Sequence, residues 1–305
     1  MIKYSLSIIL LFISHLAISQ YQIGLVPRVS PDKAVFQKIG YTEVNVKYGS
    51  PATKDREIWG MLVPYNNVWR AGANNATTVE FNSKVTINKM SLDSGKYSLF
   101  MIPRENDRWT IIFNKTHKQW GAFKYDENED ALRVDILPKK TANKTENLNY
   151  SISQVGYKFG SIILNWDFLE IEIPFETNYL QQFQEEVESR ANKQAEYIKW
   201  VVFVQGAEHL VEIKSNESLA ERWINEAENI MSKTTEWNDQ FYPREYIEGH
   251  LYWIKASLLA RSNKFKEAIE YSDKLMSLKN TMYYDRKNEV KSIDASIEKW
   301  KKEIE

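Results

Sequence analysis

The chain has 305 residues, with 40 basic and 41 acidic side chains and a formal net charge of −1 at pH 7. Positive and negative charges are nearly equal in number, so the chain lacks the excess of basic residues typical of a nucleic-acid-binding protein. We therefore expect no nucleic-acid partner. The absence of cysteine excludes a disulfide framework and a lipid-modified cysteine. Aromatic residues make up 13% of the chain and provide ample material for a hydrophobic core.

The first 19 residues have the pattern of a signal peptide. Lys3 gives a short positive region, an apolar run follows over residues 8–18, and the small residues Ala17 and Ser19 suit signal peptidase. This run is too short to cross a bilayer as a helix, and no later segment reaches the roughly 20 apolar residues required. We expect cleavage near Ser19-Gln20 and export to the periplasm or cell exterior, with no transmembrane segment left. A retained N-terminal anchor is the alternative.

Glycine and proline, which mark turns, divide the chain into two parts. Nine of the 11 glycines and seven of the eight prolines precede residue 177, so the first part is rich in turns and the second is nearly uninterrupted. We place a boundary near Thr177. The expected organisation is a signal peptide (1–19), an N-terminal lead-in segment (20–42), a β-sandwich domain (43–176) and a helical repeat-like domain (177–305).

The pattern of the first part predicts short β-strands. Residues 43–48 alternate, with Val44, Val46 and Tyr48 on one face and polar residues on the other. Residues 77–81 and 85–87 have the spacing of a hairpin. The other expected strands are 96–102, 109–113, 131–137, 148–154, 161–166 and 169–173. Nine strands with no helical pattern between them predict an antiparallel sandwich or a jelly-roll-like barrel.

The second part has the three-and-four spacing of amphipathic helices, beginning with an apolar stripe from Leu180 to Ile198. Further helices are expected over residues 218–231, 246–259, 265–278 and 285–304. The pair around residue 262 is similar to a tetratricopeptide hairpin at Tyr252, Ala256, Leu259, Phe265 and Ala268. A plain helical bundle fits the same pattern. We therefore predict an α+β chain of two domains, an antiparallel β-sandwich or jelly-roll-like domain followed by an all-α domain of tetratricopeptide-like helical hairpins.

Motifs for catalysis and for metal binding are missing. No histidine outside the leader has a second ligand at metal-binding spacing. Residues 126–137 begin like a calcium loop, but Ala131 and Leu137 stand where that loop requires glycine and glutamate. The chain has neither a Gly-rich phosphate loop nor a nucleophile elbow. We assign no catalytic residue, no metal and no cofactor.

The most distinctive segment is VPYNNVWRAGANNATTVEF, residues 63–81. Arg70 offers a planar fork of donors to a carboxylate, a phosphate or sugar hydroxyls. Trp69 beside it offers a flat apolar platform or a cation–π partner. Gly72 allows a close approach of the backbone, and Asn74 is suited to cap a turn or to orient a polar ligand. We predict a ligand-binding loop presented by a rigid sheet.

A structural loop is the alternative interpretation of this segment. In that case the Arg70 side chain would pair within the protein, with Glu80 or Asp55 as the candidate partners.

The stretches REIWGMLVPYNNVWRAGANNATTVEF, SGKYSLFMIP, WTIIFNK and QWGAFKYDENEDALRVDI resemble the secreted bacterial domain of unknown function 2911 family, over residues 49–175. The resemblance implies an exported β-rich domain, often followed by helical repeats, with no established activity. Asn75 stands where the family motif has an acidic residue, which weakens an enzymatic interpretation. A second motif of the family is matched by the Trp120-Gly121 pair. The predicted ligand-binding set is Trp69, Arg70, Gly72, Asn74, Asn75, Thr77 and Trp120.

Two functional hypotheses from different classes follow. The first is a non-catalytic exported module that holds a small polar or anionic ligand on the β-domain and contacts a protein partner through the helices. The second is a hydrolase of an envelope or extracellular glycan that uses carboxylates of the sheet, and a pair of buried carboxylates with raised pKa facing Arg70 would favour it. Glu170 and Glu172 alternate with apolar residues as on the solvated face of a sheet. A third hypothesis places the whole function in a partner-binding groove of the helices.

Overall fold

The computed structural model describes residues 27–235, 237, 243–278 and 287–304, so the expected signal peptide lies outside the described residues. The chain divides into two compact units, Met1–Leu180 and Gln181–Glu305, which we call the β-unit and the helical unit.

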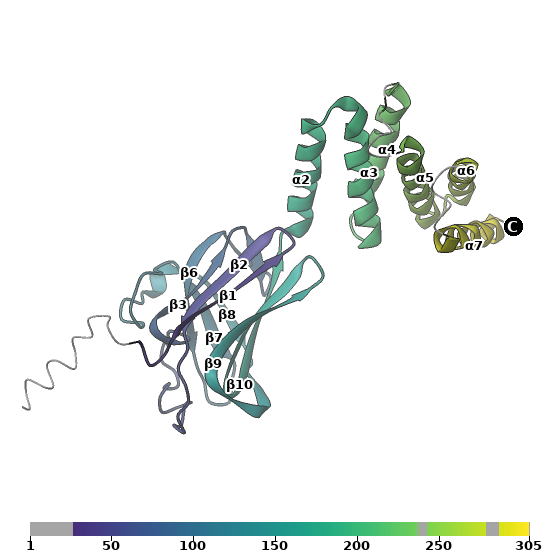
Figure 1. The fold of residues 1–305 in the computed structure, drawn as a ribbon. Helices are drawn as coiled ribbons and strands as arrows, with labels where there is room; N and C mark the ends of the chain where they lie inside the picture. The colour runs from purple at the N-terminus through teal and green to yellow at the C-terminus, as the bar shows by residue number, and fades with distance from the viewer. Residues whose placement is uncertain (1–26, 236, 238–242, 279–286, 305) are drawn as a thin grey trace, which may run out of the picture. The chain divides into compact units, whose positions relative to one another are not determined.

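Two antiparallel sheets form the β-unit (Figure 1). One sheet has the strand order β1-β2-β3-β6-β7-β8, and the other has the order β5-β4-β10-β9. The strands are β1 (Asp32–Ile39), β2 (Thr42–Gly49), β3 (Ala73–Phe81), β4 (Val85–Ile87), β5 (Met90–Leu92), β6 (Gly95–Ile102), β7 (Trp109–Asn114), β8 (Asp130–Ile136), β9 (Lys139–Val155) and β10 (Phe159–Thr177).

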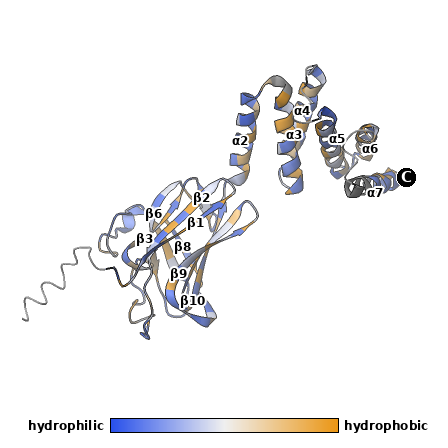
Figure 2. Ribbon diagram, viewed as in Figure 1, coloured by the Kyte–Doolittle hydropathy of each residue, from blue (hydrophilic) through white to orange (hydrophobic). Residues whose placement is uncertain are grey.

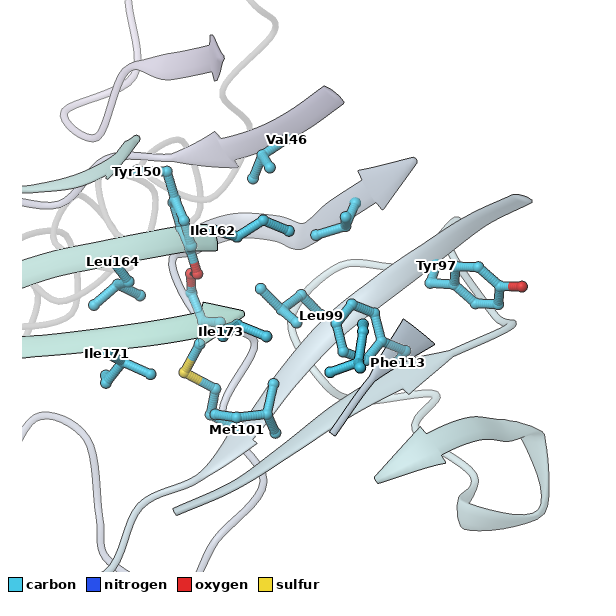
Figure 3. Packing of buried hydrophobic residues seen from close by; sticks show 14 of the residues in the cluster. Val46, Tyr97, Leu99, Met101, Phe113, Tyr150, Ile162, Leu164, Ile171 and Ile173 are labelled. Carbon is cyan, nitrogen blue, oxygen red and sulfur yellow. The ribbon is translucent and has the colours of Figure 1, made fainter. Parts of the chain in front are cut away.

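The two sheets enclose one hydrophobic core. Val46, Leu99 and Phe113 of the six-stranded sheet lie in the same buried cluster as Ile162 and Ile173 of β10 (Figure 3). Burying each such side chain stabilises the fold by about 1.5–3 kcal/mol. The core therefore gives a rigid support to the loops at the edges of the sheets.

Strand β10 is continuous where we expected two strands, and its pairing is irregular at Asp167. Before Asp167 the even-numbered residues, such as Trp166, face the core, and after it the odd-numbered residues, such as Ile171, do so. Asp167 has a left-handed φ of 53°, and the register with β9 shifts on both sides of it, with the extra residues in β9. The change in the alternation of side chains imitates a strand break in the sequence.

Strands β3 and β4 do not form the hairpin that their spacing predicted. β3 lies between β2 and β6, whereas β4 pairs with β5 and β10 in the other sheet. Residues 82–84 carry the chain across, and the Asn82 side-chain oxygen accepts a hydrogen bond from the backbone N–H of Glu43 at 2.8 Å. Strand β1 lies in the segment 20–42, where we expected no strand, and it pairs along its length with β2.

Part of the six-stranded sheet is also covered on its outer face. Phe100 and Ile112 form a smaller buried cluster there with Ala76. Ala122 and Tyr125, from the segment between β7 and β8, pack over this cluster, and the rings of Phe100 and Tyr125 meet edge to face with centroids 5.2 Å apart. Strands β6 and β7 are thus buried on both faces, which explains their unbroken apolar runs.

Six helices follow the strands in the described part of the chain, and this order confirms the predicted α+β class. They are α2 (Tyr179–Lys193), α3 (Glu196–Glu212), α4 (Glu217–Lys233), α5 (Arg244–Arg261), α6 (Phe265–Ser277) and α7 (Lys287–Ile304). Helices α3 and α4 pack together, as do α5 and α6. Hydropathy alternates around most of these helices (Figure 2).

The apolar stripe that we assigned to one helix belongs to two. Helix α2 ends at Lys193, and Ala195 has an extended backbone before α3 begins. Alanine favours a helix, so its presence in the stripe concealed the break. We also missed most of α3, in which Trp200 and Val204 are buried and apolar residues cover most of the surface, because such a helix has no clear amphipathic period.

Candidate functional site

Trp69 begins the segment that the sequence singled out, and it is bound to strand β6. Its backbone exchanges two hydrogen bonds with Met101, of 2.8 and 2.9 Å. The Trp69 ring stacks on Trp166 at a centroid distance of 5.9 Å and meets Trp59 edge-on at 5.7 Å. The Trp69 ring therefore packs against other tryptophans within the β-unit, and this packing explains why a tryptophan is present here.

The backbone after Arg70 turns sharply and is held by buried hydrogen bonds. Ala71 is fully buried and has a left-handed φ of 51°, which is unfavourable for a residue with a Cβ. Its carbonyl oxygen accepts hydrogen bonds from the hydroxyls of Thr77 at 2.8 Å and Tyr150 at 2.9 Å. Thr77 is therefore committed to the loop's own structure, and the strained turn is fixed from two sides.

Gly72 is required by close packing against strand β2. A Cβ at this position would lie 2.8 Å from the Thr77 hydroxyl oxygen and 3.0 Å from the carbonyl oxygen of Gly49. Asn74 has a left-handed φ of 62°, and its side-chain amide donates a hydrogen bond to the carbonyl of Ser30 at 2.8 Å. Both residues thus shape the loop from within.

The segment between β7 and β8 adds a short strip of β-structure to this loop. Asn75 forms an antiparallel bridge with Trp120. The backbone N–H of Ala76 donates to the carbonyl of Gln119, and that of Gly121 donates to the carbonyl of Asn74, each at 3.0 Å. We call residues 119–121 the strip. It brings the two motifs that the sequence placed 45 positions apart, from Asn75 to Trp120, into direct contact.

The strip is fastened by polar contacts further along the same segment. Arg133 donates to the carboxylate of Asp130 at 2.6 Å and to the hydroxyl of Tyr125 at 2.5 Å. The Asp130 carboxylate also accepts from the Tyr125 hydroxyl and from the Asn114 amide, both at 2.8 Å. This network holds the covering segment on the sheet and so fixes the position of the strip.

Arg70 lies against the strip and has no ionic or hydrogen-bond partner among the residues that the structure describes. The described residues place no carboxylate within ion-pair distance of its guanidinium, and its Nε is shielded from solvent without a hydrogen-bond partner. Glu80 pairs with Lys96 at 3.4 Å and Asp55 with Lys144 at 3.9 Å, so neither proposed internal partner reaches it. Burial lowers the pKa of Arg70 from its ordinary value.

Gly121 makes room for this guanidinium. Gly121 has a left-handed φ of 63°, and a Cβ there would lie 3.3 Å from Nη1 of Arg70 and 3.2 Å from the ring of Phe123. The Arg70 side chain remains partly exposed, and Phe123 beside Gly121 is 84% exposed. A partly buried cation with an unsatisfied donor is costly to the fold, and its position beside an open surface is suited to an anion.

A groove of about 760 Å³ lies on the outer face of the six-stranded sheet, beside the strip. Asn75 and Trp120 line it, whereas the other five residues of the predicted set do not. Four lysines and one carboxylate, that of Asp32, also contribute to its lining. We did not identify these lysines from the sequence, because they come from strands and a segment whose proximity only the fold determines.

The sheet carboxylates considered for glycoside hydrolysis are already engaged. Glu172 accepts hydrogen bonds from Lys139 at 2.5 Å and from the Ser161 hydroxyl at 3.0 Å, and these bonds lower the pKa of its carboxyl group. Glu170 lies 3.9 Å from the same lysine. A general acid needs a raised pKa at neutral pH, which this environment opposes for Glu172.

Among the described residues, no group of three or more metal-ligating side chains is arranged to hold an ion. In the same part of the chain, none of the helices combines the length and the apolar character needed to span a membrane.

The β-unit is thus an antiparallel β-sandwich in which Arg70 has no ionic partner among the described residues, and packed helices follow it in the chain. Residues 30–175 match the model of a family described as Protein of unknown function (DUF2911). This match supports the resemblance carried by the motifs around Arg70 and Trp120, and it covers most of the β-unit. Comparisons with curated proteins and with solved structures found no match.

Proposed function

We propose that the β-unit is a non-catalytic binding module for a small anionic ligand and that Arg70 is the anchor of the site. The observation that carries the proposal is the guanidinium of Arg70, which is partly buried and, in the described part of the chain, has neither a counter-charge nor a partner for its shielded Nε. A carboxylate or phosphate would supply both the missing charge and the missing acceptor. The strained, tightly held backbone at Ala71 fixes the arginine in place before a ligand arrives.

Two further parts of the proposal concern export and the helical unit. We propose that the chain is exported, on the basis of its first 19 residues. We also propose that the helical unit is tetratricopeptide-like and binds a protein partner, because its helices pack in consecutive pairs.

The test is ligand-dependent thermal stabilisation of the mature protein. Acetate, succinate, phosphate and sulfate would be compared with sodium chloride at equal ionic strength, for the wild type, Arg70→Lys and Arg70→Met. A specific anion at 100 times its Kd should stabilise the wild type by about 2.7 kcal/mol. We expect a weaker effect in Arg70→Lys, which keeps the charge without the fork, and none in Arg70→Met. Equal stabilisation of all three proteins would refute the role of Arg70.

A further inference from the structure

The groove beside the strip is separate from the Arg70 site. Arg70 does not line the groove, which is bounded by the outer face of β1, β2, β3 and β6 on one side and by residues 117–120 on the other. We infer that this groove is a second binding site, for a small oligoanion that bears several phosphate or carboxylate groups.

Positive charge gathers in the groove. Four lysines contribute to its lining, but Lys33 is opposite Tyr48, whose side chain lies in the core, so the Lys33 side chain is on the other face of the sheet. Lys47, Lys96 and Lys118 remain, and Asp32 is the one carboxylate. The chain as a whole has a net charge of −1, so three lysines around one cavity are a local concentration of positive charge. Such a concentration repels cations and attracts anions, more strongly in a concave surface than on a flat one.

Two of these three lysines lack an ionic partner. Lys47 and Lys118 have no carboxylate within ion-pair distance in the described chain, whereas Lys96 is paired with Glu80. The single acid does not neutralise them.

Asp32 is itself already paired. It lies 3.4 Å from Arg28, and the guanidinium of Arg28 stands 5.4 Å from the ring centre of Trp120. Arg28 thus adds a further positive charge at this end of the groove, beside an aromatic wall.

The spacing of the lysines favours a ligand with several charges. Lys47 is opposite Thr78, and Lys96 is opposite Glu80, two residues further along β3, so both lysines lie on the outer face of the sheet. Two strand spacings across and two residues along the sheet separate their Cα atoms by roughly 12 Å. A ligand with anionic groups several ångströms apart can contact both ammonium groups with extended side chains, which favours an oligoanion over a single small anion.

The experiment is calorimetric titration of the mature protein with tripolyphosphate and with citrate, and with acetate as the monoanion. The groove variant is Lys47→Gln/Lys96→Gln. The matched control, Lys140→Gln/Lys266→Gln, removes two exposed lysines from β9 and α6 that do not line the groove. We expect the wild type and the control to bind an oligoanion more tightly than acetate, and affinity to fall with added salt. The groove variant should bind on the order of tenfold more weakly, the effect of losing charge-assisted hydrogen bonds.

The groove proposal and the Arg70 proposal can be refuted independently of each other. Arg70→Met should leave oligoanion binding in the groove unchanged, whatever its effect on the Arg70 site. The inference is overturned if no oligoanion binds, if the groove variant binds as the wild type does, or if only Arg70→Met abolishes binding. A preference for tripolyphosphate over citrate, or the reverse, then identifies the phosphate or the carboxylate as the group recognised.

Discussion

Replacing Arg70 by methionine should stabilise the protein when no ligand is present. The change removes a partly buried charge and an Nε that has no hydrogen-bond partner, and methionine fills a similar volume. A buried polar group without a partner costs about 1–3 kcal/mol, and the repacking after such a swap costs less than about 1.5 kcal/mol. The net expectation is a gain of about 1 kcal/mol.

For a unit of this size, 1 kcal/mol corresponds to a rise in Tm of about 2–4 °C. Differential scanning calorimetry of the full mature chain in an anion-poor buffer measures it. Arg133→Met is the control, because Arg133 donates hydrogen bonds to Asp130 and Tyr125. The substitution leaves Asp130, whose side chain is 7% exposed, without its ion pair. The control should lose about 1–2 kcal/mol.

The two substitutions should change the free energy of unfolding in opposite directions, upward for Arg70→Met and downward for Arg133→Met. If Arg70→Met melts below the wild type by as much as Arg133→Met does, Arg70 is a structural residue, and the argument from its missing partner is wrong.

Three other predictions concern the loop, the tryptophans and the start of α2. Gly72→Ala should lower the free energy of unfolding by about 1–3 kcal/mol in urea denaturation, because the new Cβ would lie 2.8 Å from the Thr77 hydroxyl; an unchanged midpoint would contradict the packing described. Trp69→Ala should lower the free energy of unfolding by about 3–5 kcal/mol in the same assay, because it leaves a cavity in the core. Trp120→Ala, at a side chain that is 51% exposed, should cost less than about 1 kcal/mol. Similar losses for the two variants would refute the assignment of Trp69 to the core and of Trp120 to the surface. Burial beside two other tyrosines raises the pKa of Tyr179 to about 12 from 10. The contribution of this shift to stability is therefore complete below pH 10 and is lost as the pH rises to 12. Tyr179→Phe should remove this part of the pH dependence of Tm, and parallel curves for the two proteins between pH 10 and 12 would count against it.

The strands were predictable from sequence where one face is buried and the other is wet. Residues 43–48 alternate in the sequence, and β2 alternates between buried and more exposed positions up to Tyr48. The alternation failed at Asp167, because the pairing with β9 is irregular there and the sequence carries no separate sign of the irregularity. It also could not show that residues 82–84 pass between sheets, since a short polar turn fits a hairpin and a crossing equally well.

The candidate site was predictable in part. The sequence identified Arg70 as an unusual residue and linked it with Trp120 through the family resemblance, and the bridge from Asn75 to Trp120 places these motifs together. It could not show that the Arg70 guanidinium lacks a partner, because ion pairs with Glu80 or Asp55 depend on distances in the fold.

The lysines of the groove were beyond prediction from sequence for the same reason. Lys47 and Lys96 are 49 positions apart, and each one alone is an ordinary charge on the wet side of a strand. Only the strand order β2-β3-β6 places them on one face of one sheet.

The most direct test of the central claim is to observe the Nε–H group of Arg70 itself. In a spectrum of the mature protein with ¹⁵N-labelled arginine, its resonance can be assigned as the signal that Arg70→Lys lacks. We predict that titration with a carboxylate or a phosphate shifts this signal along a saturable curve, with little change at the Nε–H of Arg133, which already has partners. An Arg70 signal that stays in place with every anion, or that moves only in parallel with the signals of exposed arginines, would contradict the proposal that Arg70 anchors an anionic ligand.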